Sequence, residues 1–83
     1  MIPMLVNVKL YATLRKLAPK NVQIGEAFPL EVDSPTVNGV LYKLGIGEEQ
    51  AKIIMVNGTR VTKFDHELHP NDTIVIFPPV GGG

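Results

Sequence analysis

The feature that most limits the fold is one amphipathic helix set between segments that alternate like strands. Ser34 and Pro35 predict its start, because a serine hydroxyl caps free N–H groups and proline at the first helical position has no N–H to lose. Gly39, inside the helix, is expected to cost about 1 kcal/mol relative to alanine. Gly45 stands where a left-handed C-terminal cap is expected. Apolar residues at helical spacing form one stripe between these ends: Val37, Val40, Leu41 and Leu44.

Two strands are predicted before this helix. Residues 4–11 alternate between apolar and polar side chains, which predicts a strand with one buried face. A second alternation covers residues 27–32 and contains Pro29. Because proline cannot donate a ladder hydrogen bond, we expect this strand at the edge of a sheet. Between the two strands, residues 12–17 carry leucines at helical spacing and predict a short helical turn.

Three further strands are predicted after the helix. The apolar run 53–56 is followed by an Asn-Gly dipeptide at 57–58. This dipeptide suits the positive φ angles of a type I′ turn, which predicts a hairpin into residues 59–62. Residues 73–77 form the last strand. We expect it at the centre of the sheet, because apolar residues fall on both of its faces.

This order of elements predicts an α+β domain of the β-grasp type, a mixed sheet with one main helix packed on one face. With 83 residues, the chain fits one domain with one modest core. We therefore expect residues 1–83 to form a single domain from which residues 78–83 project as a C-terminal tail.

The composition argues against several classes of function. Eight basic residues balance eight acidic ones, and the basic residues are scattered, unlike those of a nucleic-acid surface. The absence of cysteine removes disulfides, thiolate metal ligands and a cysteine nucleophile. No apolar run approaches the roughly 20 residues that span a bilayer, and no secretory signal is visible at the N-terminus. We expect a cytoplasmic protein.

The side chains offer no convincing catalytic group. Ser34 is the single serine, it is expected to cap the helix, and no histidine is near it in sequence. His66 and His69 lie beside acidic residues in a predicted turn, but a metal site needs three or four ligands on rigid elements. We expect two solvated histidines and no metal, although they can also tune a docking surface near neutral pH. An enzyme that acts alone is therefore the weakest hypothesis.

The C-terminal tail is the strongest functional feature. Three glycines follow two prolines and a valine, and a frayed chain end is one explanation for them. The other is that the prolines project residues 80–83 by about 13 Å, so that the slender glycines enter the active site of another protein. A carboxylate at the end becomes an electrophile once it is adenylated. Sulfide can then displace AMP and leave a thiocarboxylate.

Segments along nearly the whole chain carry a family resemblance. They are residues 9–17, 34–37, 56–58, 64–68 with 71–72, and above all the Phe-Pro-Pro-Val-Gly-Gly-Gly tail at 77–83. In this order and spacing they resemble the ubiquitin-like sulfur carriers, specifically the small subunit of molybdopterin synthase (MoaD type). The thiamin-pathway carriers (ThiS type) share the fold and the Gly-Gly end. They usually lack the Phe-Pro-Pro step, so the tail favours the molybdopterin branch.

The resemblance implies partners and site residues. A ubiquitin-activating-type adenylyltransferase would adenylate Gly83 with ATP and magnesium, and a sulfur donor protein would complete the thiocarboxylate. The tail would then enter the large subunit of molybdopterin synthase. The carrier would act enzymatically only as part of that complex, and it is expected to bind no cofactor itself. The implied tail residues are Gly81 and Gly82, and the implied partner-binding residues are Phe77, Pro78, Pro79 and Val80. For Phe77, core packing at the end of its strand is a second interpretation beside partner docking.

Two features depart from the family pattern. Gly81 stands where a residue such as threonine or alanine usually precedes Gly-Gly, and this makes the tail more flexible. Arg60 and Thr62 occupy the hairpin where an apolar partner contact is expected. Three alternatives therefore stay open: a sulfur carrier for another pathway (thiamin, cysteine or tRNA thiolation), a ubiquitin-like modifier joined to lysines, and an interaction module whose glycines are incidental.

Overall fold

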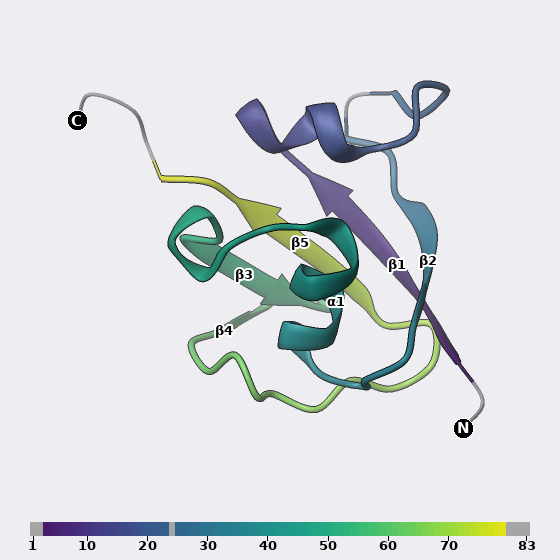
Figure 1. Ribbon diagram of the computed structural model, residues 1–83, viewed down its shortest axis with the longest axis vertical. Coiled ribbons are helices and arrows are strands. Elements are labelled where there is room, and N and C mark those ends of the chain that lie inside the picture. The colour runs from purple at the N-terminus through teal and green to yellow at the C-terminus, as the bar shows by residue number, and fades with distance from the viewer. Residues whose placement is uncertain (1–2, 24, 80–83) are drawn as a thin grey trace.

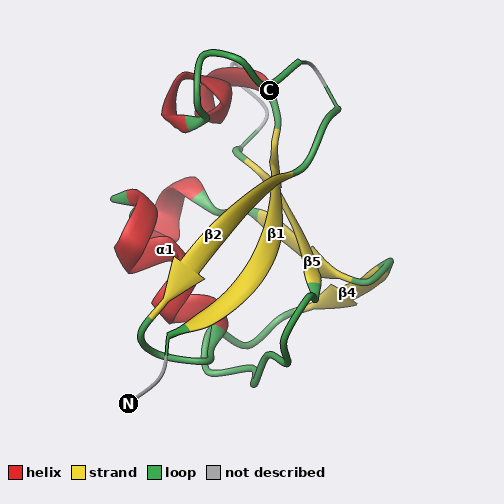
Figure 2. Ribbon diagram, turned by 90° about the vertical axis from the view of Figure 1, so that its right-hand side faces the viewer, coloured by secondary structure: helices red, strands yellow, loops and turns green. Residues whose placement is uncertain are grey.

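The computed structural model describes residues 3–23 and 25–79, which form one mixed sheet with a single α-helix on one face (Figures 1 and 2). The strand order is β2-β1-β5-β3-β4; β1 and β5 run parallel, and the other neighbours run antiparallel. This arrangement confirms the predicted β-grasp fold. The elements are β1 (Met4–Leu10), η1 (Ala12–Leu17), β2 (Phe28–Val32), α1 (Val37–Leu44), η2 (Glu48–Gln50), β3 (Ile53–Val56), β4 (Thr59–Val61) and β5 (Thr73–Phe77).

The sheet has the predicted centre and edge. β5 lies between β1 and β3, and its Ile74 and Ile76 are 0% exposed. The alternate residues of β5 are half-buried on the opposite face of the sheet. β2 forms one edge, and Pro29 is exposed there, where its missing N–H breaks no interior ladder.

The core lies between the sheet and α1. Three residues of the predicted helical stripe are fully buried, and Leu44 packs partly buried against them. In η1, Leu14 is 2% exposed but Leu17 is 37% exposed, so only one of the two leucines enters the core. The buried stripe residues are Val37, Val40 and Leu41.

Among residues 3–23 and 25–79, no helix has the length and hydropathy of a membrane span.

The helix begins two residues later than Ser34 and Pro35 predict, so the predicted N-cap was wrong. Thr36 is the N-cap: its backbone is extended and its hydroxyl accepts a hydrogen bond from the Gly39 N–H at 3.1 Å. The Ser34 hydroxyl lies 3.4 Å from that of Thr36. Tertiary contacts explain the shift. The Pro35 carbonyl accepts a 2.7 Å hydrogen bond from the Leu68 N–H, and Thr36 forms a β-bridge with Glu67, so the chain stays outside the helix until Thr36.

We expect Thr36→Ala to lower the free energy of unfolding by about 1 kcal/mol, because the Gly39 N–H loses its acceptor. Ser34→Ala is the matched control, and its effect is expected to stay within about 0.5 kcal/mol. Urea denaturation of the three proteins measures both values. Equal losses in the two variants would contradict the assignment of Thr36 as the cap.

The two predicted turns are confirmed. Gly45 ends α1 in the left-handed conformation with φ of 76°. Asn57 and Gly58 both have positive φ, 52° and 85°, as the predicted type I′ hairpin requires. The hairpin brings β4 back against β3, with Met55 opposite Arg60.

Candidate functional site

The predicted reactive end of the chain lies outside the described residues. The structure describes the segment before it, which we call the tail root and define as residues 77–79. Pro78 is half-buried and Pro79 is exposed. Neither proline can donate a ladder hydrogen bond, so the chain leaves the sheet here. The predicted site residues beyond the root, whose roles stay predictions, are Val80, Gly81, Gly82 and Gly83.

The tail root is anchored through Phe77 by both backbone and side chain. Its carbonyl accepts a 2.9 Å hydrogen bond from the Lys52 N–H. Its ring stacks on that of Tyr11, with ring centroids 4.8 Å apart and an interplanar angle of 15°. Such a pair contributes about 0.5–1.5 kcal/mol beyond its buried area. Phe77 is not part of the buried core, so the interpretation of this residue as core packing was wrong.

Tyr11 is a contact that sequence reasoning missed. It lies just beyond β1, and its aromatic ring meets Phe77 because β1 and β5 run side by side and parallel. The signal in the sequence was the strand order itself, since a β-grasp sheet pairs the first and last strands. That order places the ends of both strands together.

Figure 2 shows that α1 covers one face of the sheet, and we call the opposite face the open face. The open face carries an apolar patch beside the tail root. Val75 pairs with Met55 on β3, and two pairs further along the same ladder Phe77 pairs with Ile53. Because side chains alternate between the two faces of a strand, both pairs project from the open face. These residues are half-buried and are not among those packed against the core. The patch, which Tyr11 extends, consists of Tyr11, Ile53, Met55, Val75 and Phe77.

The two hairpin residues that depart from the family pattern lie at the edge of this sheet. The register places Arg60 on the same face as Met55, and Arg60 is exposed. Thr62 follows β4 and is exposed as well. The open face therefore has an apolar centre and a cation at its β4 edge.

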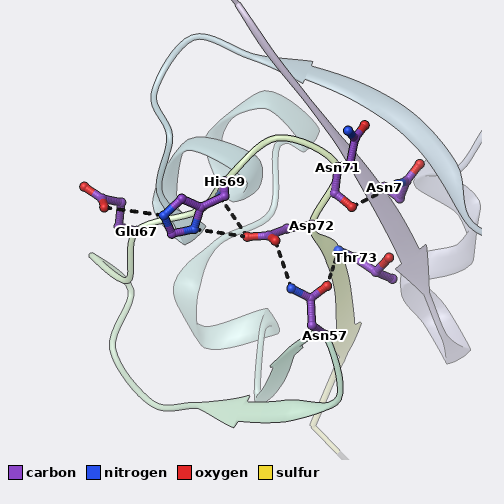
Figure 3. Close-up of polar contacts among 7 residues, drawn as sticks. All are labelled: Asn7, Asn57, Glu67, His69, Asn71, Asp72 and Thr73. Atoms are coloured by element: carbon purple, nitrogen blue, oxygen red, sulfur yellow. Dashed lines mark hydrogen bonds and ion pairs between the residues drawn. The ribbon is translucent and has the colours of Figure 1, made fainter.

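The loop before β5 is held by Asp72 (Figure 3). One carboxylate oxygen accepts a 2.8 Å hydrogen bond from the Asn57 side-chain amide, and the other accepts one of 2.8 Å from the His69 N–H. The Asn57 side-chain oxygen accepts a 2.9 Å hydrogen bond from the Thr73 N–H. Asn57, predicted only as a turn residue, thus also ties the β3–β4 hairpin to the start of β5.

The two histidines of this loop face solvent, as expected. Both are exposed, and the His69 ring lies 4.0 Å from a Glu67 carboxylate oxygen and 3.9 Å from one of Asp72. Within residues 3–23 and 25–79, no group of three or more histidine or acidic side chains is placed to hold a metal ion.

The Asp72 network makes stability depend on pH. Burial raises the pKa of this carboxyl, but the hydrogen bonds from His69 and Asn57 and the nearby histidines lower it more, so the pKa lies below the ordinary 3.8. A lowered folded pKa means that the stabilisation is present above pH 3.8 and is lost as pH falls through the folded value. We expect Asp72→Asn to be less stable at neutral pH and to lose less stability between about pH 5 and pH 2. Urea denaturation across this range checks it; equal acid losses in both proteins would contradict it.

Solved structures share the fold. A putative molybdopterin converting factor, subunit 1, from Pyrococcus furiosus is 27% identical, with a TM-score of 0.65 over 93% of this chain and 99% of that one. The small archaeal modifier protein 1 from Methanosarcina acetivorans is 26% identical, with a TM-score of 0.67 over 100% of both chains. A chain from the complex of subunits 1 and 2 of molybdopterin-converting factor from Helicobacter pylori 26695 is 20% identical, with a TM-score of 0.58 over 96% of this chain and 100% of that one.

The sequence comparison identifies the family. No curated protein sequence matches the chain. The profile of the ThiS family matches residues 8–83, from β1 through the predicted tail. This span includes the whole sheet apart from the first residues of β1, together with α1, the tail root and the three glycines. The chain therefore belongs to the ThiS family.

Proposed function

We propose that this protein is a sulfur carrier whose Gly83 carboxylate is adenylated and then converted to a thiocarboxylate. The observation that carries the proposal is the combination of a fixed tail root with a glycine tail inside the family match. Phe77 is held by Lys52 and Tyr11, and neither of the two prolines after it can continue the β ladder. A fixed origin lets an extended tail of about 13 Å deliver its end to one place on a partner.

The chemistry needs no side chain of this protein. A carboxylate oxygen of Gly83 attacks the α-phosphorus of ATP and pyrophosphate leaves, which gives an acyl adenylate. Sulfide from a sulfur donor protein attacks the acyl carbon, and AMP leaves with the original oxygen. One terminal oxygen is thereby replaced by sulfur. The activating partner supplies ATP and magnesium, which neutralises the phosphate charge that develops during transfer.

We further propose that the sulfur is delivered for molybdopterin synthesis, with the large subunit of molybdopterin synthase as the acceptor. Three observations support this pathway: the Phe-Pro-Pro step, the Pyrococcus furiosus neighbour at 27% identity, and the two-subunit complex formed by the Helicobacter pylori neighbour. In that complex the protein would be the small subunit. Activation and transfer would take place in the cytoplasm, where the adenylating partner has access to ATP.

A protein modifier is the second candidate. It is favoured by the Methanosarcina acetivorans neighbour, a small archaeal modifier protein at 26% identity over the full length of both chains. The same activated Gly83 would then form an isopeptide bond with a lysine instead of accepting sulfide.

Intact-protein mass spectrometry separates these functions. The protein is incubated with ubiquitin-activating-type adenylyltransferases and a sulfide source, with ATP and without it. The proposal expects an ATP-dependent mass gain that matches one oxygen replaced by one sulfur. High-mass lysine adducts would instead support the modifier, and an unchanged mass with several such enzymes would contradict both.

A further inference from the structure

We propose that Lys9 and Arg60 select the protein partner by pairing with carboxylates on its docking surface. This inference rests on the proposed function, because the partner in question is the adenylating enzyme that receives the tail. The partner surface would carry an apolar centre, which covers the patch on the open face, with an acidic residue on either side of it.

The geometry follows from one row across the sheet. Lys9 on β1 pairs with Val75 on β5, Val75 pairs with Met55 on β3, and Met55 pairs with Arg60 on β4. Residues paired in this way project from the same face. The row therefore has two apolar residues at its centre and a cation at each end, and with strands about 4.8 Å apart the ends lie about 14 Å from each other.

Neither cation has an ion-pair partner within the described residues. The two ion pairs in this part of the chain both join His69 to an acidic side chain, Glu67 in one and Asp72 in the other. On the open face, Glu31 of β2 lies opposite Leu5, four residues along β1 from Lys9 and so about 13 Å away. Glu48 and Glu49 line the same cleft of about 540 Å³ as Arg60, yet neither comes within 4.0 Å of its guanidinium.

Charge complementarity then sets the chemistry of the occupant. A second copy of this chain would bring the same two cations to the row, and like charges across an interface are unfavourable. A nucleic acid needs a clustered basic surface, whereas this chain has net charge zero and the row carries only two cations, one at each end. A protein surface with an apolar centre and flanking carboxylates would cover the apolar centre of the row and pair with the cation at each of its ends.

The two parts of the row would have different effects on binding. Burying the apolar centre supplies affinity, because it removes nonpolar surface from water. Charges at the rim mainly raise the association rate and exclude partners of the wrong charge. Lys9 and Arg60 would therefore act as specificity-determining residues, while the apolar patch accounts for most of the contact.

Steady-state kinetics of adenylation test the inference, with the ubiquitin-activating-type adenylyltransferase of the source organism as the probe. Arg60→Glu and Lys9→Glu are expected to raise the KM for the carrier about tenfold each with little change in kcat, and the wild-type KM is expected to rise with salt. Lys20→Glu and Lys43→Glu, at exposed sites outside the strands, are matched controls expected to stay within about twofold. Thermal unfolding confirms that each variant is folded.

The outcomes separate this inference from the proposed function. Wild-type adenylation with the same KM in all four variants, or a lower KM in Arg60→Leu, would overturn the role of the cations and leave the carrier function intact. Dimers of the free wild-type protein that dissociate in Arg60→Glu would also overturn it, because a second copy would then occupy the face. Failure of the wild-type protein to be adenylated would overturn the proposed function and this inference together.

Discussion

Deleting Gly82 and Gly83 is expected to reduce ATP-dependent sulfur loading to the level seen without ATP. The shortened chain ends in a carboxylate at Gly81, about 7 Å short of the original reach, so the reactive group no longer arrives at the adenylating centre. Thermal unfolding should not change, because Ile76 is the last residue of the buried core in the described segment 25–79. Intact mass after incubation with the activating enzyme measures the loading.

A change that preserves the length of the tail is the control. Gly81→Ala keeps the carboxylate at the same distance from the tail root and restores a side chain of the kind that the family usually has before Gly-Gly. It should load sulfur at a rate close to that of the wild type. Full loading of the shortened chain would show that sulfur loading does not depend on Gly82 and Gly83.

Gly39→Ala is expected to destabilise the protein by up to about 2 kcal/mol. A Cβ at this position would overlap the Ser34 carbonyl oxygen and would lie 3.0 Å from the Ser34 carbonyl carbon, and both are backbone atoms that cannot turn away. Overpacking of this kind typically costs about 1–3 kcal/mol. It outweighs the roughly 1 kcal/mol that alanine gains in helix propensity. Urea denaturation gives the difference in unfolding free energy.

Asn38→Ala is the matched control for this prediction. Asn38 is the exposed neighbour of Gly39 on the same helix, where alanine gains helix propensity and meets no crowding. We expect no loss of stability there. A more stable Gly39→Ala protein would mean that helix propensity decides at this position, and that the contact with Ser34 is relaxed at little cost.

The parts of the fold that the sequence predicts are those set by local pattern. β1 alternates residue by residue because one of its faces is buried, and the Asn57-Gly58 turn needs two positive φ angles that few dipeptides tolerate. The start of α1 was misplaced because Ser34 and Thr36 are both competent caps. The tertiary hydrogen bonds of this segment decide between them: the Leu68 N–H donates to the Pro35 carbonyl, and the Val37 N–H donates to the His66 carbonyl.

The candidate site can likewise be predicted from the sequence only in part. The chemistry of the tail is visible in the sequence, because it depends on glycines, prolines and a carboxylate. The anchoring of its root is not, since Tyr11 and Phe77 are distant in sequence and meet only through the parallel pairing of β1 and β5. The row of Lys9 and Arg60 likewise exists only once the register of four strands is known.

If Gly83 receives the sulfur, the new atom can be located in the loaded protein. The protein is loaded with the activating enzyme, ATP and sulfide, then cleaved, and the C-terminal peptide is sequenced by tandem mass spectrometry. We expect one oxygen to be replaced by sulfur at Gly83, and only when ATP is present. Sulfur on any other residue, or a C-terminal peptide of unchanged mass, would contradict it.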